Sequence, residues 1–78
     1  MDDALTKMDH KIWLVTVGER IRAARKAKGW SQKKLSEISG VSETSLRNYE
    51  IGRNEAGFYS IEKLAIALDT TTDAFRGW

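Results

Sequence analysis

The chain has 78 residues, of which 31% are charged, and it carries a formal net charge of +2. This length suits one domain with a small hydrophobic core, and the absence of cysteine excludes a disulfide framework and a thiolate metal site. The N-terminal residues lack the features of a signal peptide, and no apolar segment approaches the length of a membrane span. We therefore expect a cytoplasmic protein without a membrane partner.

The first 15 residues form a predicted extension that precedes the domain. Its first residues, 1 to about 11, are polar and acidic without periodicity, so we expect them to be flexible or loosely docked. His10 is the only histidine, and without a second ligand it is expected to be a surface residue rather than part of a metal site. Residues 12–15 are all apolar and must be covered. They either pack on the domain as a strand or helical turn, or form a subunit interface.

The first helix is predicted to begin at Thr16. Thr16 and Glu19 have the spacing of a capping box, in which each side chain bonds the backbone amide of the other residue. Ile21 lies on the inner face of this helix, and Gly29 ends it. Trp30 is expected to fill the core at the corner that follows.

A short amphipathic helix is predicted next, over residues 32–39. Ser31 is its expected N-cap, and Leu35 and Ile38 fall on one face. Gly40 ends the helix, because glycine adopts the left-handed conformation without the cost that a Cβ imposes.

A second amphipathic helix is predicted over residues 42–51, with Ser42 as its cap. At about 100° per residue, Leu46 and Tyr49 point inward together with Ser45. The opposite face is polar and consists of Glu43, Thr44, Arg47 and Asn48.

The rest of the chain is predicted to be a loop and two helices. The loop covers residues 52–59, with Phe58 or Tyr59 as its anchor to the core. Ser60 is expected to cap the next helix. Its buried stripe consists of Ile61, Leu64, Ala65 and Leu68. A short fifth helix over residues 72–76 turns Phe75 inward.

These features together resemble the helix-turn-helix of the phage-repressor and Cro type, an XRE-like family. The residues that carry the resemblance are Ser31-Gln32, Leu35, Gly40-Val41-Ser42, Leu46, Tyr49-Glu50 and Gly52, followed by Ile61, Leu64-Ala65 and Leu68. The resemblance covers roughly residues 17–75. It implies an all-α fold, a compact five-helix lambda-repressor-like domain over residues 16–78. The implied function is sequence-specific binding of double-stranded DNA by a transcriptional regulator, as a repressor.

The resemblance also implies roles for single residues. In this fold the second helix of the pair enters the major groove and the first crosses the DNA backbone. The implied base readers are Glu43, Thr44, Arg47 and Asn48, with phosphate as the alternative target of Arg47. The implied phosphate contacts are Gln32, Lys33, Arg53 and Asn54. Arg25 and Glu50 lie where the family places a partly buried ion pair, so we expect a structural role for both.

The residue types of the outer face fit base recognition. Asn48 has the donor and acceptor that adenine requires, Arg47 can bind guanine with two hydrogen bonds, and the Thr44 methyl group fits thymine. Glu43 either accepts a hydrogen bond from cytosine or only favours the helix N-terminus electrostatically.

The charge is unevenly distributed. Residues 20–53 contain nine basic and three acidic residues, whereas residues 1–19 and 54–78 each contain two basic and four acidic residues. The positive charge is therefore centred on the predicted helix pair, either as a DNA-binding face or merely as solvated helix faces.

No set of residues suggests catalysis or a cofactor, so we expect neither. The alternative function is an antitoxin or adaptor module of the same fold that acts through a protein partner. A homodimer on a palindromic operator is expected, because a single small reading head covers few base pairs. The apolar residues suggested for its interface are Ile12, Trp13, Leu14, Phe75 and Trp78.

Overall fold

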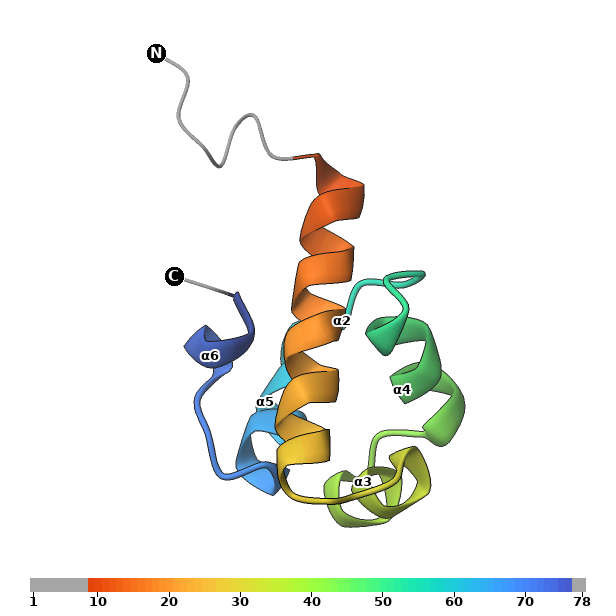
Figure 1. Cartoon of the computed structure of the whole chain (residues 1–78), viewed down its shortest axis with the longest axis vertical. Helices are drawn as coiled ribbons and strands as arrows, with labels where there is room; N and C mark the ends of the chain where they lie inside the picture. Colours follow the sequence, from red (N-terminus) through yellow and green to blue (C-terminus); the bar gives the residue numbers. More distant parts are fainter. Residues whose placement is uncertain (1–8, 77–78) are drawn as a thin grey trace.

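The structure, a computed structural model, describes residues 9–76, so the expectations for residues 1–8 and Trp78 fall outside the described part. This part is all-helical. Its helices are α2 (His10–Ala27), α3 (Gln32–Ser39), α4 (Glu43–Glu50), α5 (Phe58–Ala67) and α6 (Thr72–Arg76). The long α2 runs through the middle of the bundle, with α3 and α4 on one side and α6 on the other (Figure 1). The predicted five-helix, all-α fold is confirmed.

The first helix begins six residues earlier than predicted. Asp9 is its N-cap, and the Asp9 carboxylate accepts a hydrogen bond of 2.7 Å from the backbone amide of Lys11. Thr16 cannot act as a cap, because its hydroxyl donates to the carbonyl of Ile12 one turn earlier, at 2.8 Å. The apolar residues 12–15 therefore belong to α2. Ile12 is 57% exposed, whereas residues 13–15 are half-buried.

The core draws one fully buried side chain from each of the five helices. They are Ile21, Leu35, Leu46, Leu64 and Phe75. Each contributes about 1.5–3 kcal/mol through burial, which is a large share of the stability of so small a domain. The core therefore ties every helix to the others, and Trp30 packs against it at the corner after α2, as predicted.

The buried stripe of α5 is confirmed, but the start of this helix was predicted wrongly. The helix begins at Phe58, with Gly57 as N-cap, so Ser60 lies inside its first turn and does not cap it. Phe58 and Tyr59 are 73% and 74% exposed, so neither anchors the loop. The half-buried Ala56 packs against the core instead. A small side chain suffices there because the chain passes close to the core.

Candidate nucleic-acid interface

The pair α3 and α4 is held at a fixed angle by its caps and one glycine. The Ser31 hydroxyl accepts from the amide of Lys34 at 3.0 Å, and the Ser42 hydroxyl accepts from the amide of Ser45 at 3.1 Å. Gly40 has a φ of 80°, and its amide donates to the carbonyl of Ser36 at 2.9 Å. The predicted bounds of α3 and both predicted caps are confirmed.

Only one of the two apolar residues predicted to face inward on α3 is buried. Leu35 is fully buried, but Ile38 is exposed. Three residues span about 300° of a helix, so Ile38 lies about 60° away from Leu35 and beyond the edge of the core.

The outer face of α4 carries the four predicted base readers. Glu43, Thr44 and Arg47 are exposed, and Asn48 is half-buried. On the inner side, Leu46 is fully buried and Tyr49 is half-buried, which fixes how the helix presents its outer face. The four residues thus lie on the outer side of α4, the helix at the right of Figure 1.

One further residue on this surface was missed. Ile51 follows the last residue of α4 and is 61% exposed. It lies seven residues after Thr44, which places the two on the same helix face. The spacing was available in the sequence, but Ile51 was treated only as the end of the helix. Its apolar side chain suits contact with a thymine methyl group or a sugar.

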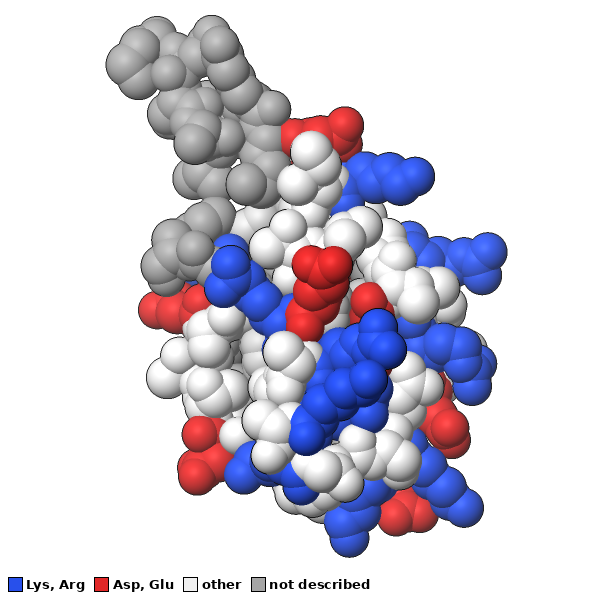
Figure 2. Space-filling view, viewed as in Figure 1, with Lys and Arg blue, Asp and Glu red and all other residues white. Residues whose placement is uncertain are grey.

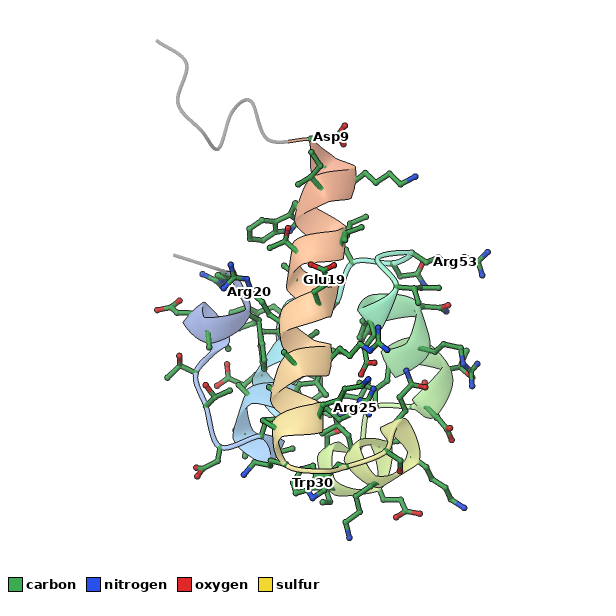
Figure 3. The ribbon with its side chains drawn as sticks, viewed as in Figure 1. Asp9, Glu19, Arg20, Arg25, Trp30 and Arg53 are labelled. Atoms are coloured by element: carbon green, nitrogen blue, oxygen red, sulfur yellow. The ribbon has the colours of Figure 1, made fainter. Side chains whose placement is uncertain are left out.

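A Schellman motif places Arg53 beside the end of α4. The amide of Arg53 donates to the carbonyl of Asn48 at 2.8 Å, and the amide of Gly52 donates to the carbonyl of Tyr49 at 3.1 Å. Gly52 has a positive φ of 76°, as this motif requires. The exposed side chain of Arg53 projects away from α2 in Figure 3. Asn54 is exposed beside it.

Arg25 and Glu50 join α2 to the end of α4 through a buried ion pair. Arg25 Nε and Nη2 donate to the two Glu50 carboxylate oxygens at 2.8 and 2.9 Å, and Nη1 donates to the carbonyl of Trp30 at 2.6 Å. The hydrogen bond to Glu50, aided by its negative charge, raises the pKa of Arg25 above its ordinary value despite burial. The expected pairing is thus present, and both carboxylate oxygens are satisfied.

Gln32 completes this network. Its Nε2 donates to Glu50 Oε1 at 3.0 Å, and the side chain is half-buried. Glu50, at the end of α4, therefore connects the start of α3 to α2. The neighbouring Lys33 is exposed, as a phosphate contact requires.

The first half of α2 backs the end of α4 at very short range. A Cβ added at Gly18 would overlap the carbonyl oxygen of Tyr49 and lie 2.9 Å from that of Glu50. One turn earlier, a Cβ added at Gly52 would lie 2.7 Å from Cγ2 of Val15. Sequence reasoning missed both contacts, because close approach of two backbones leaves no pattern of apolar residues.

A cavity of about 320 Å³ lies beside these contacts. Trp13, Leu14 and Val17 of α2 line one side, and residues 54–56 and Phe75 line others. The prediction that Phe75 belongs to a subunit interface is wrong, since this side chain is only 1% exposed. It fills the core under α2, so it cannot contact another chain.

Basic side chains are not confined to one face. In Figure 2 they project along the edge formed by α3, α4 and the following loop, and also over the front of α2. Arg20 lies on the side of α6, away from α4 (Figure 3). The positive charge of residues 20–53 is thus partly a solvated helix face and partly a surface beside α4.

Two features are absent from residues 9–76. Within this range no helix is long and apolar enough to cross a membrane. No three His, Asp or Glu side chains of the same residues are grouped in a way that could hold a metal ion. His10, on the surface as expected, lies 3.2 Å from Glu55 through its Nε2.

A family model described as helix-turn-helix matches residues 21–75, the region that contains α3, Gly40 and α4. The chain belongs to this helix-turn-helix family. An uncharacterized HTH-type transcriptional regulator derived from the SPbeta prophage of Bacillus subtilis, YonR, is 34% identical over 56 residues. These residues cover 72% of this chain and 52% of YonR. The chain spans about half the length of the HTH-type regulators it matches.

Solved structures of the helix-turn-helix family share the fold. The restriction-modification controller protein C.AhdI from Aeromonas hydrophila is 37% identical, with a TM-score of 0.77 over 80% of this chain and 94% of C.AhdI. A hypothetical transcription factor from Neisseria, NHTF, is 28% identical, with a TM-score of 0.79 over 88% of this chain and 79% of its own.

Proposed function

We propose that this helix-turn-helix chain is a transcriptional regulator that binds double-stranded DNA by inserting α4 into the major groove. The observation that carries the proposal is the outer face of α4, where polar side chains of base-reading types are exposed on a helix fixed from behind. The regulators named among its relatives support the same use. Binding rather than catalysis is the proposed activity, in the cytoplasm and as a repressor.

The predicted contacts divide into two kinds. Glu43, Thr44, Arg47 and Asn48 read bases, whereas Gln32, Lys33, Arg53 and Asn54 hold phosphates. Because Gln32 donates its side-chain amide to Glu50, its proposed phosphate contact is best made by the backbone amide at the start of α3. Phosphate contacts fix the register of the protein on DNA, and base contacts supply the specificity.

Two copies are proposed to bind one inverted repeat. Besides Ile12, the structure offers an apolar face on α5 made of Phe58, Tyr59 and Ile66, each more than 70% exposed. Tyr59 and Ile66 are seven residues apart and so share one side of the helix. This face is a better candidate for pairing than Phe75, which is buried.

The test is a selection of bound duplexes from a random pool with the wild-type chain, Asn48→Ala and Arg53→Ala. We expect the wild type to enrich a short inverted repeat. Asn48→Ala should relax the sequence preference at one position of the repeat and cost about 1–3 kcal/mol of binding free energy, because one base pair loses the side chain that reads it. Arg53→Ala should weaken all sequences evenly and reduce the dependence on salt. A folded wild-type chain that enriches no sequence would refute the proposal and favour a protein partner.

A further inference from the structure

The first half of α2 contacts the loop that follows α4, and this segment precedes residue 21, where the match to the family model begins. We propose that Val15 and the helical turns of α2 around it position the loop so that Arg53 can bind a phosphate of the DNA backbone. Val15 is thus a positioning residue and does not touch DNA itself. The inference rests on the proposed DNA-binding function. It adds a residue that affects DNA affinity from the side of the loop that faces α2.

Arg53 and the reading helix behave as one unit. The Schellman hydrogen bonds join the amide of Arg53 to Asn48, a proposed base reader, and the amide of Gly52 to Tyr49. The backbone of Arg53 therefore cannot shift without breaking the cap of α4. What this motif does not fix is the outer side of the turn, where Arg53 and Asn54 are exposed to solvent.

Val15 supports that turn from behind. The position a Cβ would take on Gly52 lies 2.7 Å from Val15 Cγ2 and 3.0 Å from Val15 Cα. The backbone of the turn therefore rests directly on Val15, against both its backbone and one of its methyl groups. Val15 itself is half-buried, and its branched side chain has few rotamers in a helix, so the surface it offers is rigid.

Two weaker contacts connect the same parts. His10 Nε2 lies 3.2 Å from Glu55 Oε1, but both side chains are more than 60% exposed. Trp13 and Leu14 line the same cavity as residues 54–56. Because the His10–Glu55 pair is open to solvent, it is a weaker support for the turn than the close contact of the half-buried Val15.

Support of this kind acts on affinity through preorganisation. A turn that is already ordered in the free protein loses less conformational freedom when Arg53 binds phosphate. Replacing Val15 by alanine removes both methyl groups, including the Cγ2 that lies beneath Gly52, and should allow the turn to move. The phosphate contact should then weaken, whereas base recognition by α4 should not, because Gly18 and Arg25 still hold that helix.

The experiment is a double-mutant cycle on the duplex enriched by the selection, with Val15→Ala, Arg53→Ala and the double variant. We expect Val15→Ala to weaken binding about three- to tenfold and to lower the salt dependence as Arg53→Ala does. The double variant should bind within about twofold of Arg53→Ala, since Val15 acts through Arg53. Thr16→Ala is the matched control, as it makes a similar truncation at the next residue of α2, whose hydroxyl bonds the carbonyl of Ile12 within the same helix.

Amide hydrogen exchange in the free protein supplies a readout that needs no DNA. Val15→Ala should speed exchange at the amides of Gly52 and Arg53, while Thr16→Ala should not. Unchanged exchange at Arg53, or fully additive losses in the cycle, would overturn the inference. If the wild type binds no duplex, the proposed function fails, and the exchange result alone decides whether Val15 holds the turn.

Discussion

At the scale of single residues, Glu50 has the most connections. Its carboxylate receives hydrogen bonds from Arg25 of α2 and Gln32 of α3, and it lies at the end of α4. Three helices therefore meet at one buried charge. A buried ion pair contributes little over an apolar pair of the same shape, but removal of one partner leaves the other charge uncompensated.

Arg25→Ala is therefore expected to lower the free energy of unfolding by about 3 kcal/mol, near the low end for a buried pair because Gln32 still donates to Glu50. The raised pKa of Arg25 means that its contribution is complete at every pH below its high unfolded-state value. The loss should thus be equal near neutral pH and about one unit above it. Urea denaturation measures it, with the exposed Arg22→Ala as control. An unchanged midpoint for Arg25→Ala would contradict the structural role.

At the scale of elements, α2 determines how α4 is presented. Gly18 lets the two helices approach until a Cβ would meet the carbonyl oxygens of Tyr49 and Glu50. Both atoms belong to backbone that is fixed by the cap of α4, so they cannot move aside as a flexible side chain would.

We expect Gly18→Ala to destabilise the fold by about 2 kcal/mol, although alanine favours helices, because overpacking against backbone exceeds the gain in propensity. Gly57→Ala is the control, since nothing lies within 4 Å of a Cβ at that position. It should change stability by less than about 1 kcal/mol. Thermal or urea denaturation of both variants measures the change in stability. Equal effects of the two substitutions would argue against close packing at Gly18.

Much of the fold followed from the sequence, and the errors have physical causes. The caps at Ser31 and Ser42 and the turn at Gly40 were predictable because each is a local choice of the backbone. The start of α2 was not predictable in this way, because Thr16 and Glu19 also fit a capping box. The helix continues toward the N-terminus beyond Thr16, where residues 13–15 pack on the domain. The contacts at Gly18 and Gly52 depend on tertiary geometry and have no local pattern.

At the scale of the whole molecule, three of the six large apolar side chains exposed within residues 9–76 lie on α5, namely Phe58, Tyr59 and Ile66. The side chains of Phe58 and Ile66 are each 73% exposed and lie outside the core. The ring of Tyr59 is partly covered by Lys63, whose Nζ lies 4.8 Å from the ring centre. Exposed large apolar groups gathered on one helix are typical of an interaction surface.

We expect the wild-type chain to be a dimer at micromolar concentration and Ile66→Glu to be a folded monomer, because a charge at the centre of an apolar interface is costly to bury. Light scattering after size exclusion gives the mass, and circular dichroism confirms the fold. Ile12→Glu tests the interface suggested by the sequence. If that variant alone dissociates, pairing occurs through the start of α2, and a monomeric wild type would rule out both surfaces.

The close approach at Gly18 also has a use in comparing genomes. Val15 and Gly18 stand ten and seven residues before Arg25, and Gly52 stands two after Glu50. A chain that keeps Val-x-x-Gly before this arginine and Tyr-Glu-x-Gly across the end of the reading helix has the room for the same crossing of backbones. A bulky residue in place of the glycine forces a wider crossing and a different tilt of the reading helix. Members of the family can therefore be sorted by helix tilt from one upstream position, before any of their structures is determined.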